Sequence, residues 1–414
     1  MEELLNDRTL LPDDAPPLAL ETRFTRRTRE VQTLFGPIDL TRSYYHHQRN
    51  GHGRCPFDES LDLTRGHTPA LAKLICRASA QGGSYAEAEA DLNLYSGLQL
   101  DARSFGRMVG QVAPVLREAL ITLPPASTPP GAAPVQVLYV SSDGTGTPMR
   151  KEELTGIKGK QPDGSARTRE AKLGCVFTQS RTNEKGEPVR DEGSTSYVGT
   201  FEECRSAGIL LHQEAHRRGY GSAPQIVCLG DGAAWIWENM RLSFPGAAQV
   251  LDFYHASEHL GALAAALLGS GSAAAKERQS QWCHELKNSD SRRIIKQAQQ
   301  ELEAAAPGSL SQSAREEAQR EIDYFKTHQD RTRYGECRAK GWFIGSGVVE
   351  AGCKTVIGRR LKQSGMFWSK RGGEDILSLR CLIMGPHFEA AWQARQPILE
   401  RQRRKARRWS ASAN

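Results

Sequence analysis

The sequence predicts an α/β core that is preceded by a helical domain and interrupted by an all-helical insertion. Short apolar runs typical of buried strands occur between residues 135 and 254, where they alternate with helical patterns. The stretch 256–340 is rich in Ala, Glu, Gln and Arg and has no strand pattern. A Pro-rich stretch at 121–134, too stiff for regular structure, separates the core from helical patterns at 67–120.

Length and composition exclude several classes of protein. A chain of 414 residues exceeds one ordinary core, so two or three domains are expected. No apolar run approaches the length of a membrane span, and the start has no signal-peptide pattern. The nine cysteines are scattered without CxxC pairing, which favours reduced thiols. We therefore expect a cytoplasmic protein that has no membrane partner.

The order of elements in the core narrows the fold class. Strands are predicted at 135–140, 172–178, 196–201, 225–229 and 249–254. One helix, at 202–218, follows the third strand, and another, at 233–240, follows the fourth. Three strands, helix, strand, helix, strand is the order of a ribonuclease-H-like core, which we take as the predicted fold.

The helical patterns at 67–120 suggest a DNA-binding domain. A helix opens at Pro69, Ser84 can cap a second helix, and Asp101 can cap a third after a break at Gly97. Short helices joined by a Gly-containing turn fit a helix-turn-helix. Arg103 and Arg107 would then lie on the outward face of the last helix and contact DNA. A small helical bundle without DNA-binding activity is the alternative.

Basic residues crowd both ends of the chain, although the formal net charge is only +7. Four arginines lie between residues 23 and 29. The tail at 396–414 holds another basic cluster, in which we assign DNA contacts to Arg403, Arg404, Lys405, Arg407 and Arg408. Two basic ends fit a polyanionic partner, most simply double-stranded DNA; solvated basic tails are the alternative.

The N-terminal segment also holds a His- and Cys-containing knuckle. His47, His52 and Cys55 could supply three zinc ligands, with Gly51 and Gly53 allowing a tight turn. The spacing is irregular and no Cys pair follows, so a His-rich surface turn is the alternative to bound Zn²⁺.

Three carboxylates are the candidate catalytic residues. Asp143 and Asp231 each come just after a predicted strand and are each followed by Gly, at the sheet edge where ligands bind in α/β folds. Glu350 falls in the first turn of a helix that Ser346 can cap, with Lys354 on a neighbouring face. Three acids that converge repel unless cations lie between them, and their oxygens select Mg²⁺ or Mn²⁺. Two such ions would suit phosphoryl transfer on nucleic acid.

Five segments together resemble bacterial DDE transposases, and within them the IS-Kra insertion-sequence group, which is related to Mutator-like elements. They are SDGT (142–145), GDGAAWIW (230–237), DFYHASEH (252–259), GSGVVEAGCK (345–354) and RLKQSGMFWS (360–369). The resemblance spans roughly residues 40–385 and implies that Asp143, Asp231 and Glu350 are the metal-binding triad. It also implies DNA cleavage and strand transfer at the ends of a mobile element. Asp252 and His255 match an auxiliary motif of this clan, and Lys354 is a further auxiliary candidate.

The resemblance leaves two departures and two alternatives. Relatives tend to have Cys where this chain has His in the knuckle, and the start is short for the group, so a truncated N-terminus is one expectation. A catalytically inactive DNA-binding protein and another ribonuclease-H-like nuclease, such as a Holliday-junction resolvase, are the alternatives; the full set of acids argues against the first.

We expect a homodimer or higher oligomer on paired DNA ends. The predicted domains are 1–66 (basic segment), 67–120 (helix-turn-helix-like), 121–134 (linker), 135–255 and 341–395 (core), 256–340 (insertion) and 396–414 (basic tail).

Overall fold

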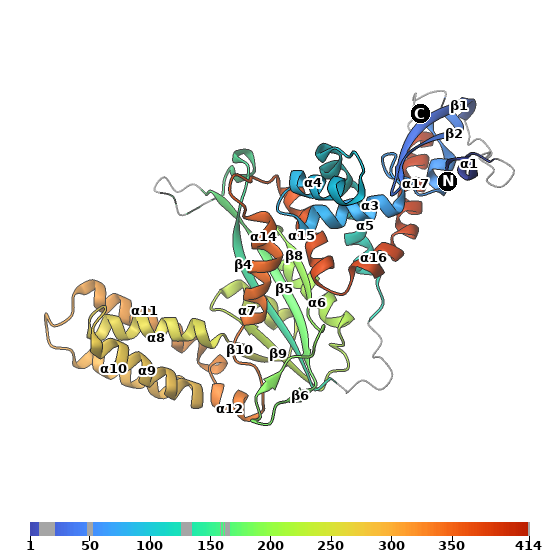
Figure 1. Cartoon of the computed structure of the whole chain (residues 1–414). Coiled ribbons are helices and arrows are strands. Elements are labelled where there is room, and N and C mark those ends of the chain that lie inside the picture. Colours follow the sequence, from blue (N-terminus) through green and yellow to red (C-terminus); the bar gives the residue numbers. More distant parts are fainter. Residues whose placement is uncertain are drawn as a thin grey trace.

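A mixed five-stranded sheet lies at the centre of the computed structural model (Figure 1), with strand order β10-β9-β4-β5-β8. The structure describes residues 1–7, 21–47, 53–125, 135–157, 159, 161 and 166–412; for residues 21, 24, 47 and 406–412 it describes the backbone alone. The central strands are β4 (Val137–Pro148), β5 (Thr168–Gln179), β8 (Ser196–Thr200), β9 (Gln225–Gly230) and β10 (Ala248–Leu251). β4, β5 and β8 pair antiparallel, whereas β9 pairs parallel with both β4 and β10.

The predicted strands and helices of the core are confirmed, in the predicted order. Helix α6 (Cys204–Arg217) follows β8, and α7 (Ala234–Ser243) follows β9. Every residue of β5 from Ala171 to Gln179 is buried, as expected of a strand covered on both faces. A Cβ on Gly174 of β5 would meet Leu211 of α6, so α6 covers one face. On the opposite face of the sheet, Leu377 of α15 (Lys370–Met384) packs against Gly199 of β8.

Two strand boundaries differ from the prediction. β4 does not end before Asp143 but continues to Pro148, because its antiparallel pairing with β5 runs on to Pro148↔Thr168. Its parallel pairing with β9 stops earlier, at Ser141↔Leu229, so the far half of β4 and β5 extends beyond the sheet. β10 ends at Leu251, and Asp252 already caps the following helix.

The described part of residues 1–47 contains a long hairpin. β1 (Glu21–Thr33) pairs antiparallel with β2 (Gly36–His47), and the short β3 (Gly53–Arg54) follows on the far side of β2. Helices α1 (Glu2–Asn6) and α2 (Pro56–Ser60) pack near the hairpin. Val31, Leu40 and Phe57 form a small apolar cluster there, apart from the main core.

The helical segment that follows has the predicted caps but a longer last helix. Its helices are α3 (Pro69–Gln81), α4 (Tyr85–Ser96) and α5 (Ala102–Thr122). Ser84 accepts a hydrogen bond from the Glu87 backbone N–H, and Asp101 accepts one from Arg103 N–H. Gly97 ends α4 at φ +71°, a left-handed conformation that favours glycine. Both α3 and α5 contact α15, so their apolar faces join the main core.

The insertion is a helical bundle that projects from one end of the sheet (Figure 1). Its helices are α8 (Phe253–Leu268), α9 (Ala273–Asn288), α10 (Arg292–Ala304) and α11 (Gln312–His328), followed by α12 (Tyr334–Ala339). Breaks at 269–272 and 305–311 separate α8 from α9 and α10 from α11. Trp282 is buried inside the bundle, where its indole N–H donates to Gln297.

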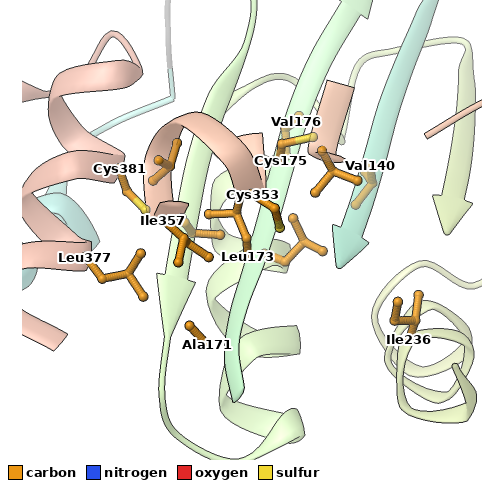
Figure 2. Close-up of a cluster of buried hydrophobic side chains, with 14 of the residues drawn as sticks. Val140, Ala171, Leu173, Cys175, Val176, Ile236, Cys353, Ile357, Leu377 and Cys381 are labelled. Atoms are coloured by element: carbon orange, nitrogen blue, oxygen red, sulfur yellow. The ribbon is translucent and has the colours of Figure 1, made fainter. Parts of the chain in front are cut away.

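The chain then returns to the sheet and ends in helices. α13 (Gly347–Gly352), a π-helical turn at Cys353–Gly358 and α14 (Arg359–Leu361) form one continuous rod. After α15 come α16 (Phe388–Ala394) and α17 (Gln396–Ser412). Figure 2 shows Cys353 and Ile357 of the rod beside Leu173 of β5, with Leu377 and Cys381 of α15 next to them. No helix in the described residues is both long and apolar enough to cross a membrane.

Candidate active site

Asp143 and Asp231 lie on neighbouring parallel strands at the same edge of the sheet. The register pairs Ser141 of β4 with Leu229 of β9, and each aspartate follows its paired residue by two positions. Asp231 caps its own turn, because its Oδ1 accepts a hydrogen bond from Ala233 N–H at 2.8 Å. The Asp143 Oδ1 accepts one from Gly144 N–H at 2.6 Å. Local hydrogen bonds thus orient both carboxylates at the carboxyl end of β9.

Helix α13 brings Glu350 to these aspartates. It contacts both β4 and β5, and a Cβ on Gly352 would lie 3.0 Å from Leu173 on β5. Burial raises the pKa of the Asp143 carboxyl, and the negative charges of Asp231 and Glu350 raise it further. The charges of Asp231 and Glu350 therefore act on Asp143 and disfavour its ionised form. The three carboxylates come from three separate elements, and an acid cluster of this type is stabilised when a cation enters it.

The π-helical turn sets the geometry of the rod next to Asp143. The Cys353 side chain hydrogen bonds to Asp143, and burial followed by the Asp143 charge raises the pKa of the Cys353 thiol. π-turns expose carbonyls, and the buried Arg380 of α15 donates to two of them, Thr355 O and Val356 O. The same guanidinium donates to Ala80 O at the end of α3. Burial lowers the Arg380 pKa to about 10. Such turns are frequent at functional sites.

Asp252 ties the start of the insertion to the start of the Glu350 helix. Its Oδ1 caps α8 by accepting from His255 N–H at 2.7 Å. Its Oδ2 accepts from Ser346 N–H at 2.5 Å. The sequence predicted that the Ser346 side chain caps α13, but it does not. Its hydroxyl instead donates to Glu350 Oε1 at 2.9 Å. A chain of hydrogen bonds therefore runs from Asp252 through Ser346 to Glu350.

The His255 backbone N–H bonds to Asp252, and the His255 ring packs against other aromatic rings. Its ring lies 5.2 Å from that of His259, which stacks on Tyr324 of α11 at 3.7 Å. His259 Nδ1 is 2.6 Å from Glu321 Oε2. A Cβ on Gly232 would lie 2.5 Å from the Tyr324 ring, so the tyrosine covers the backbone next to Asp231. Burial and then the Asp231 charge raise the pKa of Tyr324.

Sequence reasoning did not single out Tyr324 or a second residue, Lys362. The Lys362 ammonium donates to Thr145 Oγ1 at 2.6 Å, two residues along β4 from Asp143. The favoured candidate, Lys354, is exposed on the rod. Lys362 follows Glu350 by twelve residues. The π-turn between them changes the helical periodicity, so the spacing did not predict that Lys362 lies near Asp143. For Tyr324 the one signal was Gly232, whose missing side chain leaves room for a close neighbour.

The three acids suit hard divalent cations, although they are not already gathered as ligands. Within the part of the chain that the structure describes, no three His, Cys, Asp or Glu side chains stand close enough to hold one metal ion. The donor set is nevertheless all carboxylate oxygen, the type that Mg²⁺ and Mn²⁺ take. For the zinc knuckle, His52 lies outside the described residues, as does the His47 side chain. Cys55 is described, and burial raises its thiol pKa.

The side chains predicted to contact DNA differ in their exposure and in whether they are bound to other residues. Arg103 and Arg107 are exposed at the start of α5, with the Arg107 Nε–H donating to Arg103 O at 3.1 Å. Arg403 is held by Asp62 at 3.2 Å and by Glu59 O at 3.1 Å. Arg404 and Lys405 are exposed on α17. The side chains of Arg407 and Arg408 lie outside the described residues.

Comparison with known proteins gives similarity to solved structures but no match by sequence. No family model matches the sequence, and no curated protein matches it. Among solved structures, the chain is similar to one described as the Drosophila P element transposase strand transfer complex. The two chains are 8% identical with a TM-score of 0.28, over 78% of this chain and 80% of the other.

Proposed function

We propose that this protein is a DNA transposase of the DDE class, which cleaves DNA and transfers the cut strand with divalent cations. The support comes first from the sheet. Its order, β10-β9-β4-β5-β8 with three antiparallel strands followed by two parallel ones, is that expected of a ribonuclease-H-like core. In such a core the first strand and the next parallel strand present their acids at one edge, as β4 and β9 do here.

The observation that carries the proposal is the approach of Asp143, Asp231 and Glu350. Register places the two aspartates side by side, and the charges of the other two acids act on Asp143. These carboxylates would hold the ions. Divalent cations bound there supply Lewis acidity and an activated water or 3′-hydroxyl for attack on a phosphodiester. The Lys362 ammonium, which donates to Thr145, would pair with a phosphate of the DNA strand that is cut.

The chain's own residues hold the site in shape around the acids. Asp252 and Ser346 fix Glu350 by hydrogen bonds, and Arg380 fixes the π-turn that follows it. Tyr324 closes the side of the site next to Gly232. These contacts orient the groups that support Glu350 and the π-turn before a substrate binds. The long insertion and the helices of 67–122 exceed the needs of a simple nuclease, which favours transposition over junction resolution.

The test is incubation of the full chain with a duplex that carries the inverted repeats flanking its own gene. We expect strand cleavage at the repeat ends with Mg²⁺ or Mn²⁺ and none with EDTA, because the acids alone activate no nucleophile. Cleavage that persists in EDTA contradicts a metal-dependent reaction. Tight binding to the repeats without cleavage at any Mg²⁺ or Mn²⁺ concentration instead supports the non-catalytic DNA-binding alternative.

A further inference from the structure

The first strand of the hairpin is an arginine-rich edge. Within the described residues, β1 pairs along its length with β2, in the order β1-β2-β3, and its other edge is bridged to His67 at Gln32. Its side chains at Arg23, Arg26, Arg27 and Arg29 are exposed. The Arg27 guanidinium lies 3.9 Å above the ring of Tyr44, a contact that holds the charged side chain in place. Arg29 keeps 44% of its side chain exposed, 3.8 Å from Asp58.

The last helix is the second arginine-rich element. Arg401, Arg404 and Lys405 are exposed on α17. Arg404 is 74% exposed and makes a long contact of 3.5 Å with Glu400, one turn earlier. Exposed pairs of this kind contribute little energy, so the guanidinium remains available to another anion.

These two elements, the opposite ends of the sequence, meet at α2 and the residues just after it. Asp58 binds the β2 residue Arg42 at 2.8 Å. Four residues later, Asp62 accepts from Arg395 at 2.5 Å and from Arg403 on α17 at 3.2 Å. In the view of Figure 1, α17 is drawn in the same region as β1 and β2, and Arg403 of α17 donates to Glu59 O and to Asp62 there.

The backbone at the junction indicates that this arrangement is specific. Asp62 has φ +52°, a left-handed conformation that is unfavourable for a residue with a side chain. Strain of this sort costs about 1 kcal/mol or more and persists where surrounding contacts impose it. The donors from Arg395, Gln396 and Arg403 supply those contacts. Arg403 thus anchors α17 to the hairpin, and its neighbours face outward.

We propose that Arg27 and Arg29, which share one face of β1, and Arg404 and Lys405 of α17, together the composite basic surface, bind the phosphate backbone of one DNA duplex. The proposal rests on the proposed function in one respect, that duplex DNA is the substrate. Guanidinium groups match phosphate geometry, and a two-stranded β-ribbon fits the major groove of B-DNA. The acids at the junction, Asp58 and Asp62, are occupied by Arg42 and Arg403, which leaves the outward face positive.

The test measures binding of a mixed-sequence duplex in EDTA, without cleavage, over a range of salt concentrations. Each lost phosphate contact lowers the slope of log affinity against log salt by about 0.9. We expect Arg27→Ala and Arg404→Ala each to lower the slope by about one contact, and the double variant by about two. Arg27→Lys should retain the slope because it retains the charge.

Arg241→Ala is the matched control, because Arg241 of α7 is 64% exposed and is paired with a glutamate three residues earlier. Its slope should equal that of the wild type. Unchanged slopes in both test variants overturn the proposal and point to another partner, such as an acidic protein. A change in only one variant overturns the joint surface. Because the assay contains no metal, its outcome is independent of cleavage: a failed cleavage test with lowered slopes refutes the transposase activity alone.

Discussion

Replacing Asp231 by Asn is expected to lower metal-dependent DNA cleavage by about 10³-fold, which corresponds to roughly 4 kcal/mol of transition-state stabilisation. Asn keeps the size of the side chain and one oxygen, and that oxygen can still accept from Ala233 N–H. It removes the negative charge that a cation needs. Asp143→Asn and Glu350→Gln should have effects of similar size, since all three acids belong to the proposed metal site. Duplex binding in EDTA should stay near that of the wild type. Cleavage by gel assay under single-turnover conditions measures the loss.

The control for these variants is Asp323→Asn on α11, an exposed acid that is 3.6 Å from Lys326. It removes the same charge from a helix of the insertion and should leave cleavage unchanged. Near-normal cleavage by any one variant of the triad would refute the assignment of that acid.

Replacing Asp252 by Ser is expected to reduce cleavage by about 10²-fold while costing less than about 2 kcal/mol of folding stability. Ser is as good a helix cap as Asp, so α8 keeps its start. Its shorter side chain does not reach Ser346 N–H, which leaves a buried donor without a partner at a cost of about 1–3 kcal/mol before relaxation. Ser346 then no longer holds Glu350, so the Mg²⁺ concentration that gives half-maximal rate should rise.

Three further variants separate positioning from stability. Asp252→Ala removes the cap as well and should lower the melting temperature further. Ser346→Ala removes only the hydroxyl that donates to Glu350, and we expect a smaller rise in the Mg²⁺ requirement. Ser272→Ala removes the cap of α9, which accepts from Ala275 N–H, and should lower stability alone. An unchanged Mg²⁺ requirement in Asp252→Ser would show that Asp252 merely supports the fold.

Much of the fold follows from local sequence signals. The core strands are continuous apolar runs, and burial of β5 on both faces explains why its sequence shows no alternation. Ser84 and Asp101 are good helix caps, and both form the expected bonds. The predicted end of β4 was wrong. Pairing with β5 continues through the polar residues 141–147, where the sequence has no hydrophobic pattern that indicates a strand. Asp143 therefore lies within a strand and not after one.

The remainder of the candidate site depends on contacts between distant segments. Nothing local to Arg380 indicates that it donates to a π-turn that begins 27 residues earlier, at Cys353, and the π-turn has no sequence signature of its own. Tyr324 reaches Gly232 because the C-terminal end of α11 returns from the insertion to the sheet. The two basic ends were recognised from composition, but their meeting at Asp62 depends on the packing of α17.

The most direct test of the triad is a titration of the full chain with Mn²⁺ in the absence of DNA. The concentration of free Mn²⁺ is measured by electron paramagnetic resonance. The wild type should bind Mn²⁺, and Mg²⁺ should compete for the site. Asp231→Asn should weaken binding at least about tenfold, or about 1.4 kcal/mol, and Asp323→Asn should not. Equal Mn²⁺ affinity in the wild type and in the Asp143, Asp231 and Glu350 variants would contradict a metal site formed by these carboxylates.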